Sequence, residues 1–175
     1  MIQIYNGSTA ILIKRWLDHI KSTNHKRTYK VWHKGCVAID DALIVHCGAN
    51  EHITRPRMPR SSSSLQFGWS TDTYVLEYKK GKGRCFSSDW YWLEQRKSQR
   101  VGSIYTPLSY SVTFIFEDFE VRLPVGKVIY IPAWIEYEIK KVLKKTFLVH
   151  TYVMAPRIQI SAYLRFRKIL PDRFR

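Results

Sequence analysis

The sequence predicts an α+β fold, an antiparallel sheet with a few packed helices forming one domain over residues 1–175. Two kinds of segment support this prediction: short runs of β-branched and aromatic residues, and runs whose apolar residues recur at helical spacing. The 175 residues, 45% hydrophobic and 14% aromatic, are enough for a domain with its own core. No internal repeat and no clear linker divides the chain.

Strand-like segments recur along the whole chain, separated by glycine, proline and polar turn residues. The last of them alternates apolar and polar side chains, which predicts a half-exposed strand with a basic outer face. The expected β segments are 1–5, 73–78, 104–130, 147–154 and 156–170.

Three segments carry helix signals. The first begins after a Ser8 or Thr9 cap and runs to about Ile20, with apolar residues at helical spacing. The second begins at Ser88 or Asp89 and ends near residue 100, before a glycine suited to a C-cap. The third, 132–145, has proline in its first turn and lysines at its end, the charge order that the helix dipole favours.

The net charge of +15, from 29 Lys+Arg against 14 Asp+Glu, favours a polyanionic partner: nucleic acid, an acidic protein surface or an anionic membrane surface. The alternative is that the charge serves solubility alone. We expect an exposed loop at 55–64 and a basic turn at 79–84. The candidate nucleic-acid-binding residues in these two segments are Arg55, Arg57, Arg60, Lys79, Lys80, Lys82 and Arg84.

Several classes of protein are not favoured. The three cysteines, Cys36, Cys47 and Cys85, have no CxxC spacing, so we expect reduced thiols, no metal site and no cofactor. No apolar run approaches 18 residues, and no secretory signal is visible at the N-terminus. We expect a cytoplasmic or virion-associated protein whose oligomeric state the sequence does not indicate.

Residues 29–56 read as a β-hairpin that carries two histidines. Two short apolar runs, 36–39 and 42–45, flank Asp40-Asp41, a pair suited to a two-residue turn. This register places His33 and His46 on one face, one diagonal apart. They then form either a reactive pair or a half-buried, hydrogen-bonded structural pair.

The hairpin pattern His-x-Gly-x-Val-x-Ile-Asp-Asp-x-x-Ile-Val-His resembles the histidine hairpin of the permuted NlpC-like papain fold. That group includes the lecithin:retinol acyltransferase family and viral H-box proteins. The resemblance covers residues 1–60, because a short strand and an amphipathic helix precede the hairpin here too. It implies that His33 is a general base for a cysteine nucleophile and that His46 orients it.

The resemblance places the nucleophile after the histidines, at the start of a helix, and two positions compete. Cys85 precedes the helix expected from Asp89 and lies near cations that lower a thiol pKa. The start of the segment 132–145 suits the fold better, but Ala133 stands there and no cysteine does.

A second resemblance concerns residues 118–126, which are similar to the last motif of phage ADP-ribosyltransferases. It implies a catalytic Glu120, with Ser61–Ser64 in place of the middle motif. The initial Arg-Gly of that family is absent, and Asp118 stands where a Glu is expected. The alternative is an ordinary charged hairpin.

Two functions follow. The first is a non-catalytic, strongly basic binding or structural protein of phage or viral type on a papain-like scaffold, contacting nucleic acid or an acidic partner. The alternative is a thiol hydrolase or acyltransferase that cleaves an amide or ester bond with Cys85, His33 and His46.

Overall fold

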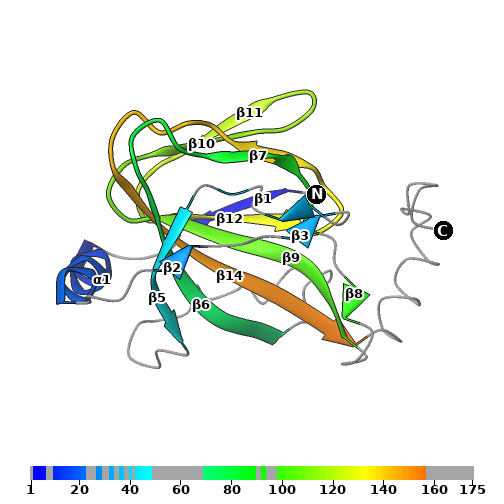
Figure 1. Cartoon of the computed structure of the whole chain (residues 1–175), viewed down its shortest axis with the longest axis horizontal. Helices are drawn as coiled ribbons and strands as arrows, with labels where there is room; N and C mark the ends of the chain where they lie inside the picture. Colours follow the sequence, from blue (N-terminus) through cyan, green and yellow to red (C-terminus); the bar gives the residue numbers. More distant parts are fainter. Residues whose placement is uncertain are drawn as a thin grey trace.

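A computed structural model describes residues 2–6, 10–22, 27–28, 32–33, 36–37, 40, 42–48, 69–89, 92–93 and 98–156. Over these residues the fold is built almost entirely of antiparallel strands, with one helix. Two sheets stack as layers with the main core between them (Figure 1). The one helix among the described residues is thirteen residues long. It is not long and apolar enough to cross a membrane.

The larger sheet has eight strands, seven of them in the order β1-β12-β9-β14-β6-β5-β2, with β8 pairing β9 beside them. Neighbouring strands are antiparallel throughout. Its strands are β1 (Gln3–Asn6), β2 (Arg27–Thr28), β5 (Ala42–Gly48), β6 (Trp69–Tyr78), β8 (Trp92–Leu93), β9 (Ser98–Pro107), β12 (Lys127–Pro132) and β14 (Thr146–Pro156).

The smaller sheet has four strands in the order β11-β10-β13-β7 and forms the upper layer in Figure 1. A separate pair, β3 with β4, makes a two-stranded sheet. The strands of these two sheets are β7 (Arg84–Ser87), β10 (Val112–Ile115), β11 (Glu120–Leu123), β13 (Tyr137–Ile139), β3 (Trp32–His33) and β4 (Cys36–Val37).

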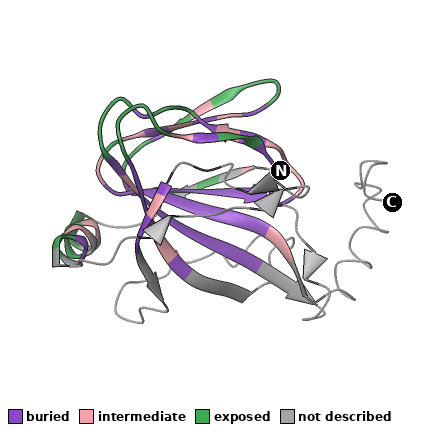
Figure 2. Cartoon of the chain, in the orientation of Figure 1, coloured by how far each residue is buried: buried purple, intermediate pink, exposed green. Residues whose placement is uncertain are grey.

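The core lies between the two layers because alternate residues of each strand face inward. Phe114 and Leu123 from the small sheet pack with Leu76, Ile129 and Leu148 from the large one. Figure 2 shows these facing surfaces as buried and the outer loops of the small sheet as exposed. The inner face also carries polar residues, which form the candidate site.

The outer face of the large sheet is covered in part by α1 (Ala10–Ser22). Ile13, Leu17 and Ile20 of the helix pack with Val75 of β6 and Val149 of β14. The helix predicted from the Ser8 or Thr9 cap to Ile20 is thus confirmed. Strands at 1–5, 73–78 and 147–154 are confirmed too, as β1, β6 and β14.

The predicted α+β class is wrong, because two of the three expected helices are strands. The segment expected as a helix from Asp89 contains β8 and the start of β9. The segment 132–145 contains the end of β12 and all of β13, where Tyr137 and Ile139 are buried and Glu138 is half-buried. That alternation has the two-residue period of a strand, which overrides the apparent helical spacing. The expected loop at 55–64 and strand at 156–170 lie outside the described residues.

Candidate functional site

A buried cation, Arg84 at the start of β7, lies at the centre of a polar cluster inside the core. All three nitrogens of its guanidinium donate hydrogen bonds. Nε donates to Ser87 Oγ at 3.3 Å, and Nη1 donates to the Tyr105 hydroxyl at 3.2 Å. Nη2 lies 2.7 Å from Asp89 Oδ1 and also donates to Ser87 Oγ and to the Ser88 carbonyl oxygen. The guanidinium is therefore held by oxygen atoms on several sides.

Asp89 is the anion of the cluster and lies in the loop that follows β7. Its backbone N–H donates to the Ala133 carbonyl oxygen at 3.0 Å, which fixes the loop to the end of β12. Its Oδ2 accepts hydrogen bonds from Ser103 Oγ at 2.5 Å and from the Tyr137 hydroxyl at 2.6 Å. Burial raises the pKa of Asp89, but the Arg84 charge and these hydrogen bonds outweigh it and lower the pKa to about 2. Asp89 is thus ionised at neutral pH.

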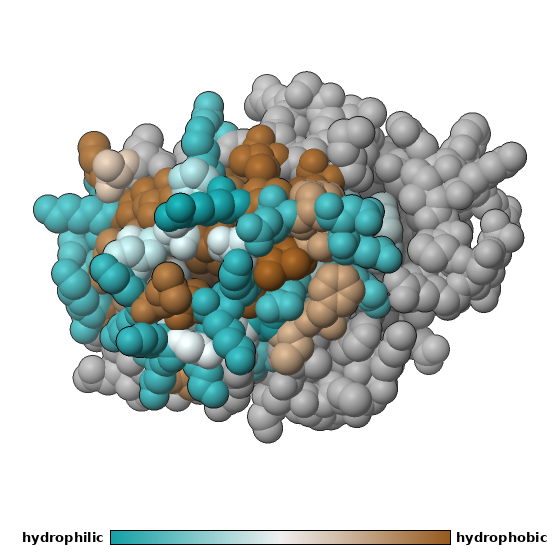
Figure 3. All heavy atoms as spheres, turned by 90° about the horizontal axis from the view of Figure 1, so that it is seen from above, coloured by the Kyte–Doolittle hydropathy of each residue, from teal (hydrophilic) through white to brown (hydrophobic). Residues whose placement is uncertain are grey.

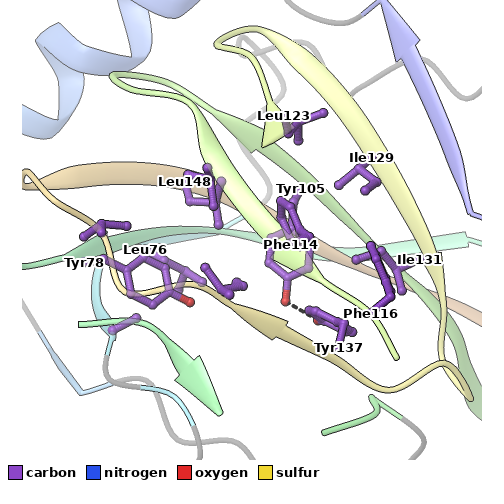
Figure 4. Close-up of a cluster of buried hydrophobic side chains, with 14 of the residues drawn as sticks. Leu76, Tyr78, Tyr105, Phe114, Phe116, Leu123, Ile129, Ile131, Tyr137 and Leu148 are labelled. Atoms are coloured by element: carbon purple, nitrogen blue, oxygen red, sulfur yellow. Dashed lines mark hydrogen bonds between the residues drawn. The ribbon is translucent and has the colours of Figure 1, made fainter. Parts of the chain in front are cut away.

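Two tyrosines join the layers through the cluster. Tyr105 of β9 and Tyr137 of β13 point toward one another, and their hydroxyls lie 2.7 Å apart (Figure 4). The Arg84 Cζ lies 4.4 Å from the centroid of the Tyr137 ring, at cation–π distance. Burial raises the pKa of both hydroxyls well above the usual value, so both stay protonated.

His150 of β14 lies on the same inner face. Its ring stacks on Tyr105 with centroids 4.3 Å apart and meets the Tyr152 ring edge-on at 4.4 Å. Burial lowers the pKa of His150 to about 3; the Asp89 charge opposes this shift, and the Arg84 and Arg100 charges add to it. The imidazole is therefore neutral at physiological pH.

A second carboxylate, Asp40, adjoins the cluster, because its backbone forms an isolated bridge with that of Arg84. Its Oδ2 accepts from the Tyr78 hydroxyl at 2.8 Å and its Oδ1 from the Ala42 N–H at 3.1 Å. Burial raises the pKa of Asp40 to about 6, although Arg84 opposes the shift. The pKa values of Asp40 and Asp89, which both lie near the Arg84 guanidinium, are thus shifted in opposite directions.

The strand pairing explains why these residues meet. Tyr137 lies directly opposite Ser87 across the antiparallel pair of β13 and β7, and Asp89 follows Ser87 by two residues. The side chains of Arg84, Asp89, Tyr105, Tyr137 and His150 are each 2% or less exposed. The cluster is therefore closed to solvent and built around the hydrogen-bonded ion pair of Arg84 and Asp89.

Comparison with known proteins gives a fold relationship. No family model and no curated protein sequence matches the chain. The chain is similar in structure to a Trichoplax adhaerens prolyl hydroxylase in complex with a hypoxia inducible factor oxygen degradation domain peptide fragment (TM-score 0.61, 12% identity, covering 93% of this chain and 86% of that one).

Two further hydroxylases share the fold. One is a prolyl-4-hydroxylase from Pseudomonas putida, with a TM-score of 0.61 and 10% identity over 87% of this chain and 91% of that one. The other is the viral collagen prolyl hydroxylase of Paramecium Bursaria Chlorella virus-1, with a TM-score of 0.60 and 13% identity over 88% and 89%. At such identities the likeness shows the fold alone, an oxygenase-like arrangement of antiparallel strands.

This fold overturns the resemblance to the permuted NlpC-like papain group. It also overturns both predicted functions, the non-catalytic binding protein on a papain-like scaffold and the thiol hydrolase, because the similar structures are oxygenases of a β-rich fold. The resemblance to phage ADP-ribosyltransferases finds no support in the structure either. Glu120 begins β11 of the β10–β11 hairpin and forms an exposed ion pair with Lys140, as the charged-hairpin alternative expects.

The predicted histidine hairpin does not form. β3 pairs with β4, where His33 lies opposite Cys36, whereas His46 lies on β5 opposite Val75 of β6. The two histidines are therefore not on neighbouring strands. Asp40 instead forms an isolated bridge with Arg84, and its buried side chain accepts a hydrogen bond from the Tyr78 hydroxyl.

The remaining predicted site residues fall into three groups. Cys85 is exposed and lies within β7, so the helix that was expected to activate it is absent there. Arg84 cannot contact a nucleic acid, because it is buried against Asp89. Lys79, Lys80 and Lys82 are exposed, as a binding role requires, whereas the last group, Arg55, Arg57 and Arg60, lies outside the described residues.

Non-haem iron oxygenases commonly hold the metal with two histidines and one carboxylate, which leaves coordination positions open. The cluster does not fit that requirement. The side chains beside Asp89 include Ser87 and Tyr137, neither of them a histidine, and the Arg84 guanidinium already binds the Asp89 carboxylate. Over the described residues, no group of three or more histidine, cysteine or acidic side chains is placed to hold a metal ion.

Sequence reasoning missed the interior cluster because its members look ordinary in the sequence. Arg84 ends a run of cations, and Asp89 resembles a helix cap. The one available signal was the strand-like alternation that places Tyr137 and Ile139 on an inner face.

Proposed function

We propose that this chain is an oxygenase-like protein that recognises an acidic, extended polypeptide segment through a basic groove on its small sheet. The observation that carries the proposal is the groove itself, about 540 Å³ in volume. It lies between the β10–β11 hairpin and the segment that joins β13 to β14. Its lining residues are Tyr110, Ser111, Val112, Thr113, Glu120, Arg122, Lys140, Lys141, Val142, Leu143, Lys144 and Thr146.

The groove is strongly cationic. Arg122, Lys140, Lys141 and Lys144 line it, and among the described lining residues Glu120 is the only carboxylate. All four cations are exposed. Their charge is therefore available to an anionic partner.

A second basic segment adjoins the groove. The Gly81 N–H donates to the Val142 carbonyl oxygen at 2.8 Å, and the Val142 N–H donates to the Lys82 carbonyl oxygen at 2.9 Å. These bonds place the turn that carries Lys79 and Lys80 beside the groove, although the two segments are far apart in the sequence. The predicted basic turn thus extends the cationic surface.

Apolar contacts are available in the same place. Leu143 is 85% exposed and Tyr110 is 46% exposed, and the Lys144 ammonium lies 5.3 Å from the centroid of the Tyr110 ring. Figure 3 looks onto this layer and shows hydrophilic side chains projecting around apolar ones. An acidic segment with interspersed apolar residues matches such a surface better than a uniformly charged strand does.

The fold comparison supports a polypeptide partner over a nucleic acid. The similar Trichoplax adhaerens hydroxylase was determined with a bound peptide fragment. A scaffold of this shape therefore accommodates a peptide in at least one other protein.

The test is a fluorescence-anisotropy titration of the full chain with a labelled acidic peptide of twelve residues containing glutamate and leucine. The double variant Lys141→Glu/Lys144→Glu is expected to weaken binding about tenfold or more, because both favourable contacts become repulsive. The matched control, Lys14→Glu/Arg15→Glu on exposed positions of α1, changes the net charge equally and should leave binding within about twofold.

Equal weakening by the two variants would show that only the overall charge matters and would remove the groove from the proposal. A single-stranded oligonucleotide of matched charge that binds tighter than the peptide would overturn it in favour of a nucleic-acid partner.

A further inference from the structure

We infer that Arg84 is a built-in replacement for a metal cation: its guanidinium occupies the position beside Asp89 where an oxygenase-like interior would otherwise hold a metal ion. The inference concerns the interior of the fold and does not depend on the groove. It rests on three observations: the position of the ion pair, the way the guanidinium is surrounded, and the identity of the neighbouring side chains.

The position is defined by strand register. Ser87 and Tyr137 face one another across the β7–β13 pair, and Asp89 follows Ser87 by two residues. Three side chains from two neighbouring segments thus converge on one interior point. A carboxylate with two further side chains on one side is the arrangement that a two-histidine, one-carboxylate site requires. Here the carboxylate is present, but a hydroxymethyl group and a phenol occupy the other two positions.

The surroundings of the guanidinium resemble a coordination shell made of oxygen atoms. Arg84 contacts Asp89 Oδ1 at 2.7 Å, Ser87 Oγ at 3.2 Å and the Tyr105 hydroxyl at 3.2 Å. The Ser88 carbonyl oxygen lies at 3.5 Å, and the Arg84 Cζ lies over the Tyr137 ring, 4.4 Å from its centroid. The shell thus places one carboxylate and several neutral oxygens around one cation.

The charge balance explains why a buried arginine is tolerated. A buried charge is stable only when it is paired and hydrogen-bonded. The Arg84 and Asp89 side chains are 0% and 1% exposed, so each depends on the other for its counter-charge. A divalent cation entering the same place would meet the fixed positive charge of Arg84 and would find its carboxylate ligand already engaged.

The experiment compares metal binding by four forms of the full chain, prepared without oxygen: wild type, Ser87→His/Tyr137→His, the triple variant Arg84→Ala/Ser87→His/Tyr137→His, and that triple variant with Asp89→Asn added. Co²⁺ is the probe, with isothermal titration and visible absorption as readouts. Neither readout requires any enzymatic activity.

We expect the triple variant to bind one equivalent of Co²⁺, with the absorption bands of a nitrogen- and oxygen-ligated ion. The double variant keeps Arg84 and should bind at least tenfold more weakly, and wild type should bind no interior ion. Asp89→Asn should abolish binding in the triple variant.

Equal affinity of the double and triple variants would overturn the inference, because Arg84 would then exclude nothing. One equivalent of Co²⁺ bound by wild type, and lost when Asp89→Asn alone is introduced into wild type as a fifth form, would overturn it too. So would the absence of binding in a folded triple variant, because residues 87, 89 and 137 would then not mark a metal position.

A second measurement decides the question if the triple variant does not fold. Arg84→Ala leaves a cavity beside an unpaired carboxylate, which millimolar methylguanidinium should fill, with a rise in melting temperature. Arg84→Ala/Asp89→Ala has the cavity without the carboxylate and should show no rise. An equal response of both variants, or no response in either, would show that the position does not select a cation.

Discussion

The interior cluster and the basic groove use the same kinds of side chain for opposite purposes. In the interior, Arg84 and Asp89 form a 2.7 Å ion pair whose side chains are 0% and 1% exposed. In the groove, Lys140 Nζ lies 3.6 Å from Glu120 Oε2, and the two side chains are 58% and 60% exposed. A buried pair is costly to break because the remaining charge has no solvent, whereas an exposed pair contributes little. The interior charges therefore hold the two layers together, and the groove charges remain available to a partner.

The largest expected effect separates the two regions directly. Arg84→Met removes the guanidinium and leaves Asp89 buried without a counter-charge, so we expect the free energy of unfolding to fall by about 4 kcal/mol. Urea denaturation at pH 7 measures the change. Lys140→Met is the matched control and should change stability by less than about 0.5 kcal/mol. A loss in Arg84→Met no larger than that in the control would remove the distinction between the regions.

The pH dependence of stability sharpens the description of the interior. Burial raises the folded-state pKa of Asp40 from 3.8 to about 6. The folded state therefore binds an extra proton between these values, so this stability contribution is complete below pH 3.8 and is lost as the pH rises through 6. The loss amounts to about 3 kcal/mol. Asp40→Asn should remove the decline between pH 4 and 7 in urea titrations, whereas the exposed Glu120→Gln should retain it.

Asp89 changes the stability in the opposite direction, and it does so at lower pH. Its folded-state pKa is lowered to about 2, so its contribution is present above pH 3.8 and is lost as the pH falls toward 2. Asp89 does not account for a decline between pH 4 and 7, so persistence of that decline in Asp40→Asn would contradict the assignment to Asp40.

Two glycines, Gly83 and Gly81, test how tightly the chain packs between the interior cluster and the groove. A Cβ added at Gly83 would lie 2.3 Å from the Ile139 carbonyl oxygen, so Gly83→Ala must displace β13 from β7. We expect a loss of about 2 kcal/mol, as for other overpacking changes. Gly81 has φ +80° with open space around it, so Gly81→Ala incurs only the backbone strain of about 1 kcal/mol. Thermal denaturation of the two variants should preserve this order, and the reverse order would place the tight contact elsewhere.

The smallest effect on stability is expected in the groove. Lys141→Glu/Lys144→Glu should change the free energy of unfolding by less than about 0.5 kcal/mol, because both residues are exposed. Raising the salt concentration from 50 to 500 mM should weaken peptide binding to wild type but leave the Arg84→Met penalty nearly unchanged, since buried charges are screened little. A strongly salt-dependent penalty would mean that water reaches the interior pair.

Local patterns predicted the elements whose signals do not depend on distant contacts. The α1 helix has an amphipathic face that packs on one sheet face, and β6 and β14 are rich in β-branched and aromatic residues. The helices predicted for segments 88–100 and 132–145 were wrong. Cap residues and helical apolar spacing occur there by composition, whereas strand pairing with β9, β7 and β10 decides the structure. Propensity is a weak guide where strand pairing is available.

The candidate site was less accessible to prediction than the fold. Its hydrogen bonds join residues from segments far apart in the sequence, and these pairs form no recognisable motif. The basic groove was predicted in part, because the sequence showed the excess of positive charge and the turn that carries Lys79 and Lys80. What the sequence did not reveal is that the turn meets Val142 and that Arg84, unlike its cationic neighbours, points into the core.

The pairing of β1 with β12 has a consequence for synthesis on the ribosome. Gln3 lies opposite Tyr130, so β1 cannot form this pair until the chain has been translated as far as β12. At ordinary rates of translation that delay is roughly 6 to 25 seconds. During this time β1 lacks the β12 strand with which it pairs in the completed large sheet.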